Sequence, residues 1–156
     1  MKQKLPLSSN QLINLLKKCT KIKNSQVKGR KFEQAIGICF NSLGNCEARQ
    51  AKNKDVFVYV KPSSKLYHYI KVVIIECKNM DQEVSSDHMG SLANKLEKYY
   101  FFGALGIMIH RSKLQEGAIE SKGSKPIIVI TLSELIDYLN ENKGIDDLIL
   151  EKFPSM

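Results

Sequence analysis

The stretch Val72-Val73-Ile74-Ile75-Glu76-Cys77-Lys78-Asn79 decides the fold that we expect for this chain. It is an apolar run, typical of a buried strand, and it ends in an acid and a base separated by one residue. Side chains alternate between the two faces of a strand, so Glu76 and Lys78 should share one face while Cys77 points to the other. A carboxylate and an ammonium group are thus expected together at the end of a stiff element.

The composition indicates one ordinary globular domain. The chain has 156 residues, of which 43% are hydrophobic and 26% charged, which argues against disorder and against fibrous classes. Lys and Arg exceed Asp and Glu by 24 − 16 = 8. This excess favours a polyanionic partner, with nucleic acid first and an anionic membrane surface second, although many basic proteins bind neither.

The cysteines and the N-terminus indicate an intracellular protein. Cys19, Cys39, Cys46 and Cys77 form no Cys-x-x-Cys pair, so buried reduced thiols are expected rather than a zinc site or disulfides. The start of the chain has no long apolar segment, and no run approaches 18 apolar residues. We therefore expect no membrane span and a cytoplasmic location.

Two helices should precede the first strand. Ser8 and Gln11 form a capping-box pattern for a helix that reaches about residue 23. A second helix is expected over about 27–43, with Gly44 ending it and Glu33 at the border of its buried face. Glu33 is either an ordinary flank carboxylate or an acid that leans over the sheet. The buried face consists of Phe32, Ala35, Ile36, Cys39, Phe40 and Leu43.

The next segment should form a β-hairpin. A possible short edge strand at 46–50 is followed by a β-branched and aromatic strand at 55–60, a polar turn at 61–65 and a second strand from about Tyr67 to Lys78. Strands joined by a short loop pair in antiparallel fashion, so the start of one lies beside the end of the other. Asp55 is thus expected close to Glu76 and Lys78.

The remainder should alternate helices and buried strands. A long helix is expected from the caps at 85–87 to near Gly103, then strands at 105–109 and 127–130 joined by a short helix at about 112–122, in a parallel β-α-β unit. Two tail helices are expected at 133–140 and 144–153. The whole chain, 1–156, would be one domain, with an N-terminal helical extension (1–26), a core (27–140) and a C-terminal helical tail (141–156).

Two carboxylates and a lysine suit phosphodiester hydrolysis, because hard oxygen ligands hold Mg²⁺ together with waters that can be activated. The spacing alone is weak evidence, since Glu-x-Lys occurs three times, at 76–78, 120–122 and 141–143. The first of these ends an apolar strand, and the neighbouring strand in the expected hairpin begins with the acid Asp55. The other two fall at expected helix ends, where charges are usually solvated.

The pattern resembles the PD-(D/E)XK nuclease superfamily, in its restriction-endonuclease-like, Mrr-type branch. The resemblance is carried by Gly29-Arg30-Lys31-Phe32-Glu33 in a helix, Asp55 opening a strand, and Ile74 to Asn79 closing the next. It implies an α/β (α+β) fold with a restriction-endonuclease-like α-β-β-β-α-β core. In that fold a central mixed sheet is flanked by helices, here with extra N-terminal and C-terminal helices. Lys54 stands where proline is common, and the helix glutamine of the Mrr branch has no sure counterpart.

The resemblance also implies a site and an activity. Asp55 and Glu76 would bind Mg²⁺ or Mn²⁺, with the main-chain carbonyl of Cys77 as a further ligand, Lys78 would position the attacking water, and Glu33 would be an accessory acid. The implied protein is a metal-dependent deoxyribonuclease of restriction or defence type, acting on DNA as a homodimer, with an additional recognition domain or subunit.

Two alternatives remain open. One is a structure-selective nuclease that cleaves branched DNA, as Holliday junction resolvases do. The other is a non-catalytic nucleic-acid-binding module with a vestigial site. Outside the core motif, five lysines are expected to flank the site and attract DNA, namely Lys52, Lys54, Lys61, Lys65 and Lys71. His88 and the pair His110-Arg111 either reach a phosphate or are ordinary loop-edge residues.

Overall fold

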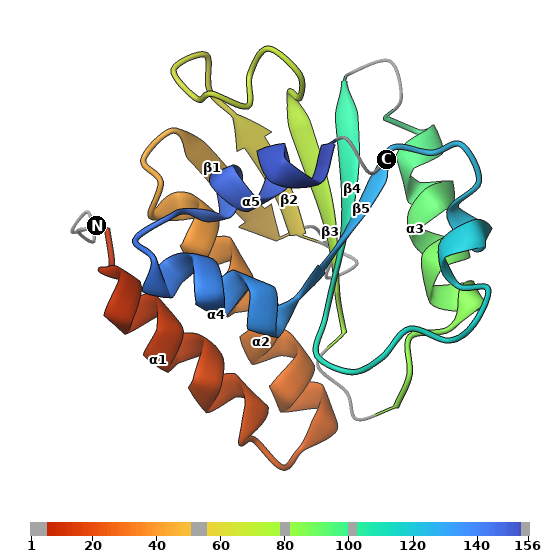
Figure 1. Cartoon of the computed structure of the whole chain (residues 1–156), viewed down its shortest axis with the longest axis horizontal. Coiled ribbons are helices and arrows are strands. Elements are labelled where there is room, and N and C mark those ends of the chain that lie inside the picture. Colours follow the sequence, from red (N-terminus) through yellow and green to blue (C-terminus); the bar gives the residue numbers. More distant parts are fainter. Residues whose placement is uncertain (1–5, 51–55, 79–81, 100–102, 154–156) are drawn as a thin grey trace.

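The computed structural model describes residues 6–50, 56–78, 82–99 and 103–153 (Figure 1). Within these ranges no helix is long and apolar enough to cross a bilayer. The elements in chain order are α1 (Ser9–Thr20), α2 (Ser25–Asn41), β1 (Cys46–Gln50), β2 (Val56–Val60), β3 (Val72–Lys78), α3 (Ser86–Glu97), β4 (Ala104–His110), a 3-10 turn η2 (Ile119–Lys122), β5 (Ile127–Thr131), α4 (Leu132–Asn140) and α5 (Ile145–Lys152).

The strands form one mixed five-stranded sheet in the order β1-β2-β3-β4-β5. β1, β2 and β3 are antiparallel neighbours, whereas β3, β4 and β5 run parallel. The predicted hairpin is confirmed, because β2 pairs with β3 in a register that sets Val56 opposite Ile75 and Tyr59 opposite Val72. The predicted edge strand is confirmed as β1. The mixed sheet flanked by helices is the expected fold class.

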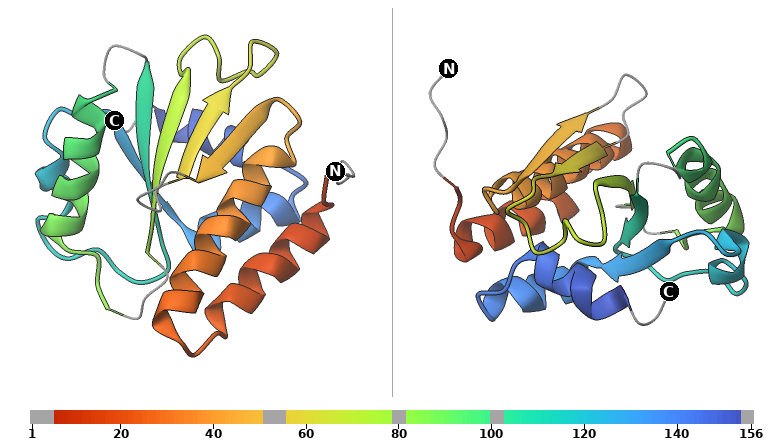
Figure 2. Two further views of the ribbon diagram at one scale, coloured as in Figure 1. Left: turned by 180° about the vertical axis from the view of Figure 1, so that it is seen from behind. Right: turned by 90° about the horizontal axis from the view of Figure 1, so that it is seen from above.

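Helices cover both faces of the sheet (Figures 1 and 2). The larger core packs α1, α2, α4 and α5 against one face and includes Val73, Ile75 and Cys77 of β3. The smaller core packs α3 against the opposite face and includes Ile74. The alternation of β3 is therefore the predicted one. Glu76 and Lys78 continue the row of Ile74 and so belong to the face that α3 covers.

The helix starts follow local capping chemistry. Ser8 and Gln11 form the predicted capping box of α1. α2 begins two residues earlier than predicted, because the Asn24 side chain accepts hydrogen bonds from two backbone N–H groups of its first turn. All four cysteines are buried thiols outside disulfide bonds, as expected. The tail folds into α4 and α5, close to the two predicted helices.

Three predicted boundaries were wrong. β3 begins at Val72 rather than near Tyr67. The residues before it form turns whose Leu66 and Ile70 side chains are buried in the larger core. α3 ends at Glu97, well before Gly103. Between β4 and β5 only the short η2 is helical.

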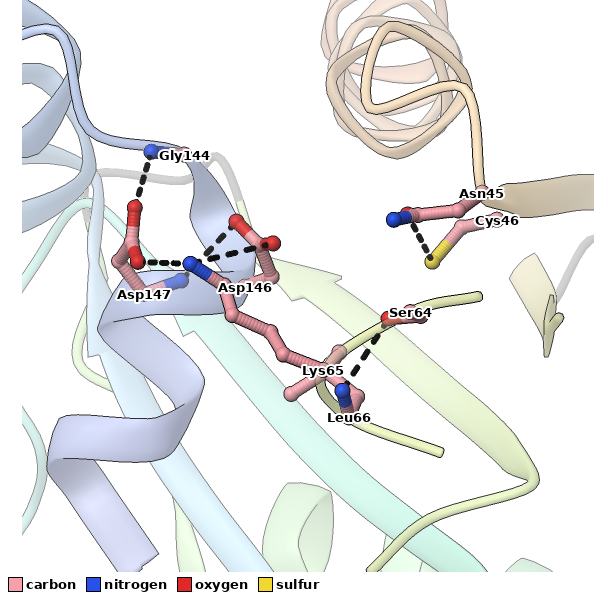
Figure 3. Close-up of polar contacts among 8 residues, drawn as sticks. All are labelled: Asn45, Cys46, Ser64, Lys65, Leu66, Gly144, Asp146 and Asp147. Carbon is pink, nitrogen blue, oxygen red and sulfur yellow. Dashed lines mark hydrogen bonds and ion pairs between the residues drawn. The ribbon is translucent and has the colours of Figure 1, made fainter. Parts of the chain in front are cut away.

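The lysines of the β2–β3 loop do not flank the Glu76 end of the sheet, contrary to expectation. Lys61 and Lys71 adjoin the paired residues Val60 and Val72, at the opposite end of the hairpin. Lys65 instead contacts the first turn of α5. Its ammonium group lies between Asp146 (3.6 Å) and Asp147, while Asp147 also accepts a hydrogen bond from the Gly144 N–H (2.9 Å; Figure 3). This contact joins the loop to the C-terminal helix.

Asp147→Ala should lower the free energy of unfolding by about 0.5–2 kcal/mol, because it removes the hydrogen bond that caps α5 and one of the two carboxylate partners of Lys65. The hydrogen bond from Lys65 lowers the pKa of Asp147 against the opposing effect of burial, and the Gly144 N–H lowers it further. A lowered folded-state pKa stabilises the fold above the unfolded-state pKa, and this contribution is lost as pH falls through the folded-state value.

Urea denaturation of wild type and Asp147→Ala should therefore differ fully at neutral pH and converge at acidic pH. Asp137→Ala, an exposed carboxylate change in α4, is the control and should cost little. Equal stabilities of wild type and Asp147→Ala at neutral pH would show that the contact contributes nothing.

Candidate active site

The candidate site begins at the C-terminal end of β3, where Glu76 and Lys78 meet. Lys78 Nζ lies 3.1 Å from Glu76 Oε1, and the Glu76 side chain retains 16% of its exposure. The Lys78 side chain is 24% exposed. The two residues predicted to share one face are therefore brought together at a position that solvent and a ligand can reach.

A second lysine, which the sequence analysis missed, completes the surroundings of Glu76. Lys95 of α3 donates to Glu76 Oε2 at 2.8 Å. Lys95 lies between the buried residues Leu92 and Leu96, on the flank of the face with which α3 packs on the sheet. That flank position, together with the shared face of Glu76 and α3, is a signal that could have identified Lys95 from the sequence.

The charges of the site keep Glu76 ionised. Burial raises the pKa of Glu76, but the hydrogen bond from Lys95 and the charge of Lys78 outweigh it, and the net pKa is lowered. Burial raises the pKa of the Cys77 thiol well above its ordinary value, and the negative charges of Glu33 and Glu76 add to this. The Cys77 side chain is thus a buried thiol on the face that α2 covers.

Glu33 approaches the site from the other side of the sheet. It lies on α2, and its Oε2 accepts a hydrogen bond from Gln50 Nε2 at the end of β1 (3.1 Å). Its negative charge raises the pKa of the Cys77 thiol, which lies on the face of the sheet that α2 covers. Glu33 therefore leans over the sheet edge, beside β1, rather than joining Glu76 on the α3 face.

Asp55, like Lys52 and Lys54, lies outside the described residues, so its side chain is not placed. Its chain neighbour Val56 pairs with Ile75, the neighbour of Glu76. Within 6–50, 56–78, 82–99 and 103–153 no group of three or more His, Cys, Asp or Glu side chains could hold a metal ion.

The donors that are present nonetheless fit a hard divalent cation. Glu76 is an ionised carboxylate, and each of its oxygens contacts a lysine ammonium group at a position that a divalent cation could take in its place. Mg²⁺ binds through one or two carboxylates and retains several waters. Glu76, the Cys77 carbonyl and water ligands are a donor set of this kind.

Two of the three histidines, His88 and His110, have structural partners. His88 Nδ1 accepts a hydrogen bond from the Ser85 N–H (3.0 Å) and so helps to cap α3. Burial lowers the pKa of His88, and the charge of Lys78 lowers it further. His110 is 4% exposed, and its Nδ1 contacts the Ser112 carbonyl.

Comparisons with known proteins agree with the fold. Residues 24–139 match the family model Mrr_cat, described as a restriction endonuclease. One solved structure, the DNA modification-dependent restriction endonuclease AspBHI, matches with a TM-score of 0.52 at 14% sequence identity, over 97% of this chain. The chain spans 41% of the length of that structure, and at such identity the likeness concerns the fold alone. No curated protein matches.

Proposed function

The chain belongs to the Mrr_cat restriction endonuclease family, and from this premise we propose that it is a Mg²⁺- or Mn²⁺-dependent endonuclease that hydrolyses DNA phosphodiester bonds. The observation that carries the proposal is the pairing of Glu76 with Lys78 at the open end of β3, within a chain of net charge +8. A polyanionic substrate is attracted by such a charge, and binding of this kind weakens as salt is added.

Each residue has a role in this proposal. Glu76 and Asp55 hold the metal ion, with the Cys77 main-chain carbonyl as a further ligand. Lys78, next to Glu76, orients the attacking water and stabilises the negative charge that develops at the scissile phosphate. Glu33 acts from the α2 side as an accessory acid. When bound, the metal ion lowers the pKa of its water and offsets phosphate charge.

Removal of metal tests the proposal. Purified protein should nick or linearise supercoiled plasmid with Mg²⁺ or Mn²⁺, and excess EDTA should stop the reaction because the catalytic ion is withdrawn. The same assay with linear duplex and a four-way junction of matched length distinguishes a duplex nuclease from a junction-selective one. Cleavage that persists in EDTA would exclude the metal-dependent mechanism.

Cutting both strands of a duplex requires two active sites, and we propose that the chain supplies them as a homodimer. Light scattering should then give twice the chain mass for the form that linearises DNA. A strictly monomeric mass under cleavage conditions would exclude double-strand cutting by this chain alone. We further propose that target choice resides in an additional recognition domain or subunit.

A further inference from the structure

A polar hollow of about 480 Å³ runs along the exposed side of α3, next to the Glu76 site. Its cations stand at one end, where Lys95 and Lys98 lie one turn apart. Asp87 lies at the other end. It precedes Lys95 by eight residues, which corresponds to about 12 Å along the helix axis at a rise of 1.5 Å per residue. The described lining residues are Ser86, Asp87, Gly90, Ser91, Asn94, Lys95 and Lys98.

The lining matches the chemistry of a nucleic-acid backbone. Phosphate oxygens are bound chiefly by Lys and Arg and by the side chains of Ser, Thr, Asn and Gln. Asn94, Lys95 and Lys98 supply such donors together, whereas Asp87 restricts a phosphate to the lysine end. Gly90 has no side chain to occupy the middle of the hollow, and a Cβ placed there would meet nothing within 4 Å.

Lys95 connects the hollow to the site. It lines the hollow and also contacts Glu76 Oε2 at 2.8 Å, while Lys78 contacts the other oxygen. A metal ion that binds Glu76 must compete with these ammonium groups for the same lone pairs. Lys78 is on the strand with Glu76, whereas Lys95 is on a separate helix and has polar space beside it, so Lys95 is the lysine that can move aside.

We propose that the lysine end of the α3 hollow binds the DNA sugar–phosphate backbone beside the scissile bond, and that Lys95 exchanges Glu76 for a backbone phosphate when the metal ion binds. This inference rests on the proposed function. Lys95 thereby neutralises Glu76 in the resting protein and becomes a substrate-binding residue in the complex.

The test compares Lys95→Met with three variants. Lys95→Arg keeps the cation, Lys98→Met alters the same hollow one turn away, and Lys18→Met removes an exposed lysine from α1 on the other side of the sheet. Calorimetric titration of the full chain with Mn²⁺, without DNA, gives metal affinity. Anisotropy of a labelled duplex over a salt series, with Mg²⁺ and in a Lys78→Met background that keeps the duplex intact, gives DNA affinity and its salt slope.

Lys95→Met should bind Mn²⁺ roughly five- to tenfold more tightly than wild type, because a competing cation is gone. Its DNA affinity should fall, and the slope of log K against log salt should lessen by about 0.9. Lys98→Met should lower the slope to a similar extent without changing Mn²⁺ affinity. Lys95→Arg keeps the positive charge and should retain the wild-type salt slope, and Lys18→Met should match wild type in both measurements.

Unchanged or weaker Mn²⁺ binding by Lys95→Met would overturn the proposal, because it would mean that Lys95 only orients Glu76. An unaltered salt slope in both hollow variants would overturn it as well. A melting curve checks each fold, and Lys95→Gln replaces Lys95→Met if the latter is unfolded. If wild-type protein cleaves plasmid but the variants do not show the expected Mn²⁺ affinities and salt slopes, only this inference is refuted. Wild-type protein that neither binds Mn²⁺ nor cleaves would refute the proposed function with it.

Discussion

Replacing Lys78 by methionine should lower the rate of DNA cleavage by about 10²–10⁴-fold, the range for a residue that aids proton transfer in the transition state. Methionine keeps most of the side-chain length and removes the ammonium group that lies 3.1 Å from Glu76. Glu76 keeps its hydrogen bond from Lys95, so the loss of the Lys78 contact should cost little stability, and binding of intact DNA should change less than turnover.

Lys152→Met is the matched control for this change. Lys152 is 27% exposed and pairs with Glu134 at 2.8 Å, so it offers the same chemistry of a half-buried Lys–Glu pair in another part of the fold. Single-turnover cleavage of a labelled duplex by both variants gives the comparison. A Lys78→Met rate within threefold of wild type, or an equal loss in Lys152→Met, would contradict the role given to Lys78.

Gly106→Val should destabilise the protein by about 1–3 kcal/mol, the usual cost of overpacking a core. Gly106 lies in β4 opposite Ile74, directly beneath α3. A Cβ at this position would stand 2.7 Å from Leu96 Cδ1 and 3.0 Å from Ile127 Cγ1. A valine would therefore push α3 away from the sheet. Since Leu96 is next to Lys95, the displacement should also weaken the contact with Glu76 and lower activity.

Gly29→Ala provides the control for adding a methyl group at a glycine. Gly29 lies within α2, and a Cβ there would meet nothing within 4 Å. Alanine in place of glycine in a helix should raise stability by up to about 1 kcal/mol. Thermal melts of the two variants should thus shift in opposite directions. A Gly106→Val protein as stable as wild type would show that α3 is not packed as described.

The sequence predicted the frame of the site because strand periodicity and hairpin pairing are local rules. The alternation of Val73, Ile74 and Ile75 placed Glu76 and Lys78 on one face before any tertiary contact was known. The antiparallel pairing that sets Val56 opposite Ile75 follows from the succession of the two strands along the chain.

The missed features depend on tertiary packing. The flank position of Lys95 on α3 can be read from the helical periodicity, but its contact with Glu76 depends on Gly106, which lets α3 approach the sheet closely. The loop lysines were misplaced for a different reason. Lys65 belongs to the connection between β2 and β3, and in an antiparallel pair this connection lies at the opposite end from Glu76.

The proposed mechanism requires a divalent metal ion at Glu76, and crystals soaked in Mn²⁺ test this requirement most directly. An anomalous difference map should show a peak within coordinating distance of the Glu76 carboxylate, about 2.0–2.2 Å for hard oxygen ligands of small divalent cations, with Asp55 as a second ligand. Protein that cleaves DNA in solution with Mn²⁺ but whose soaked crystals show no peak at Glu76 would contradict the assignment of this site.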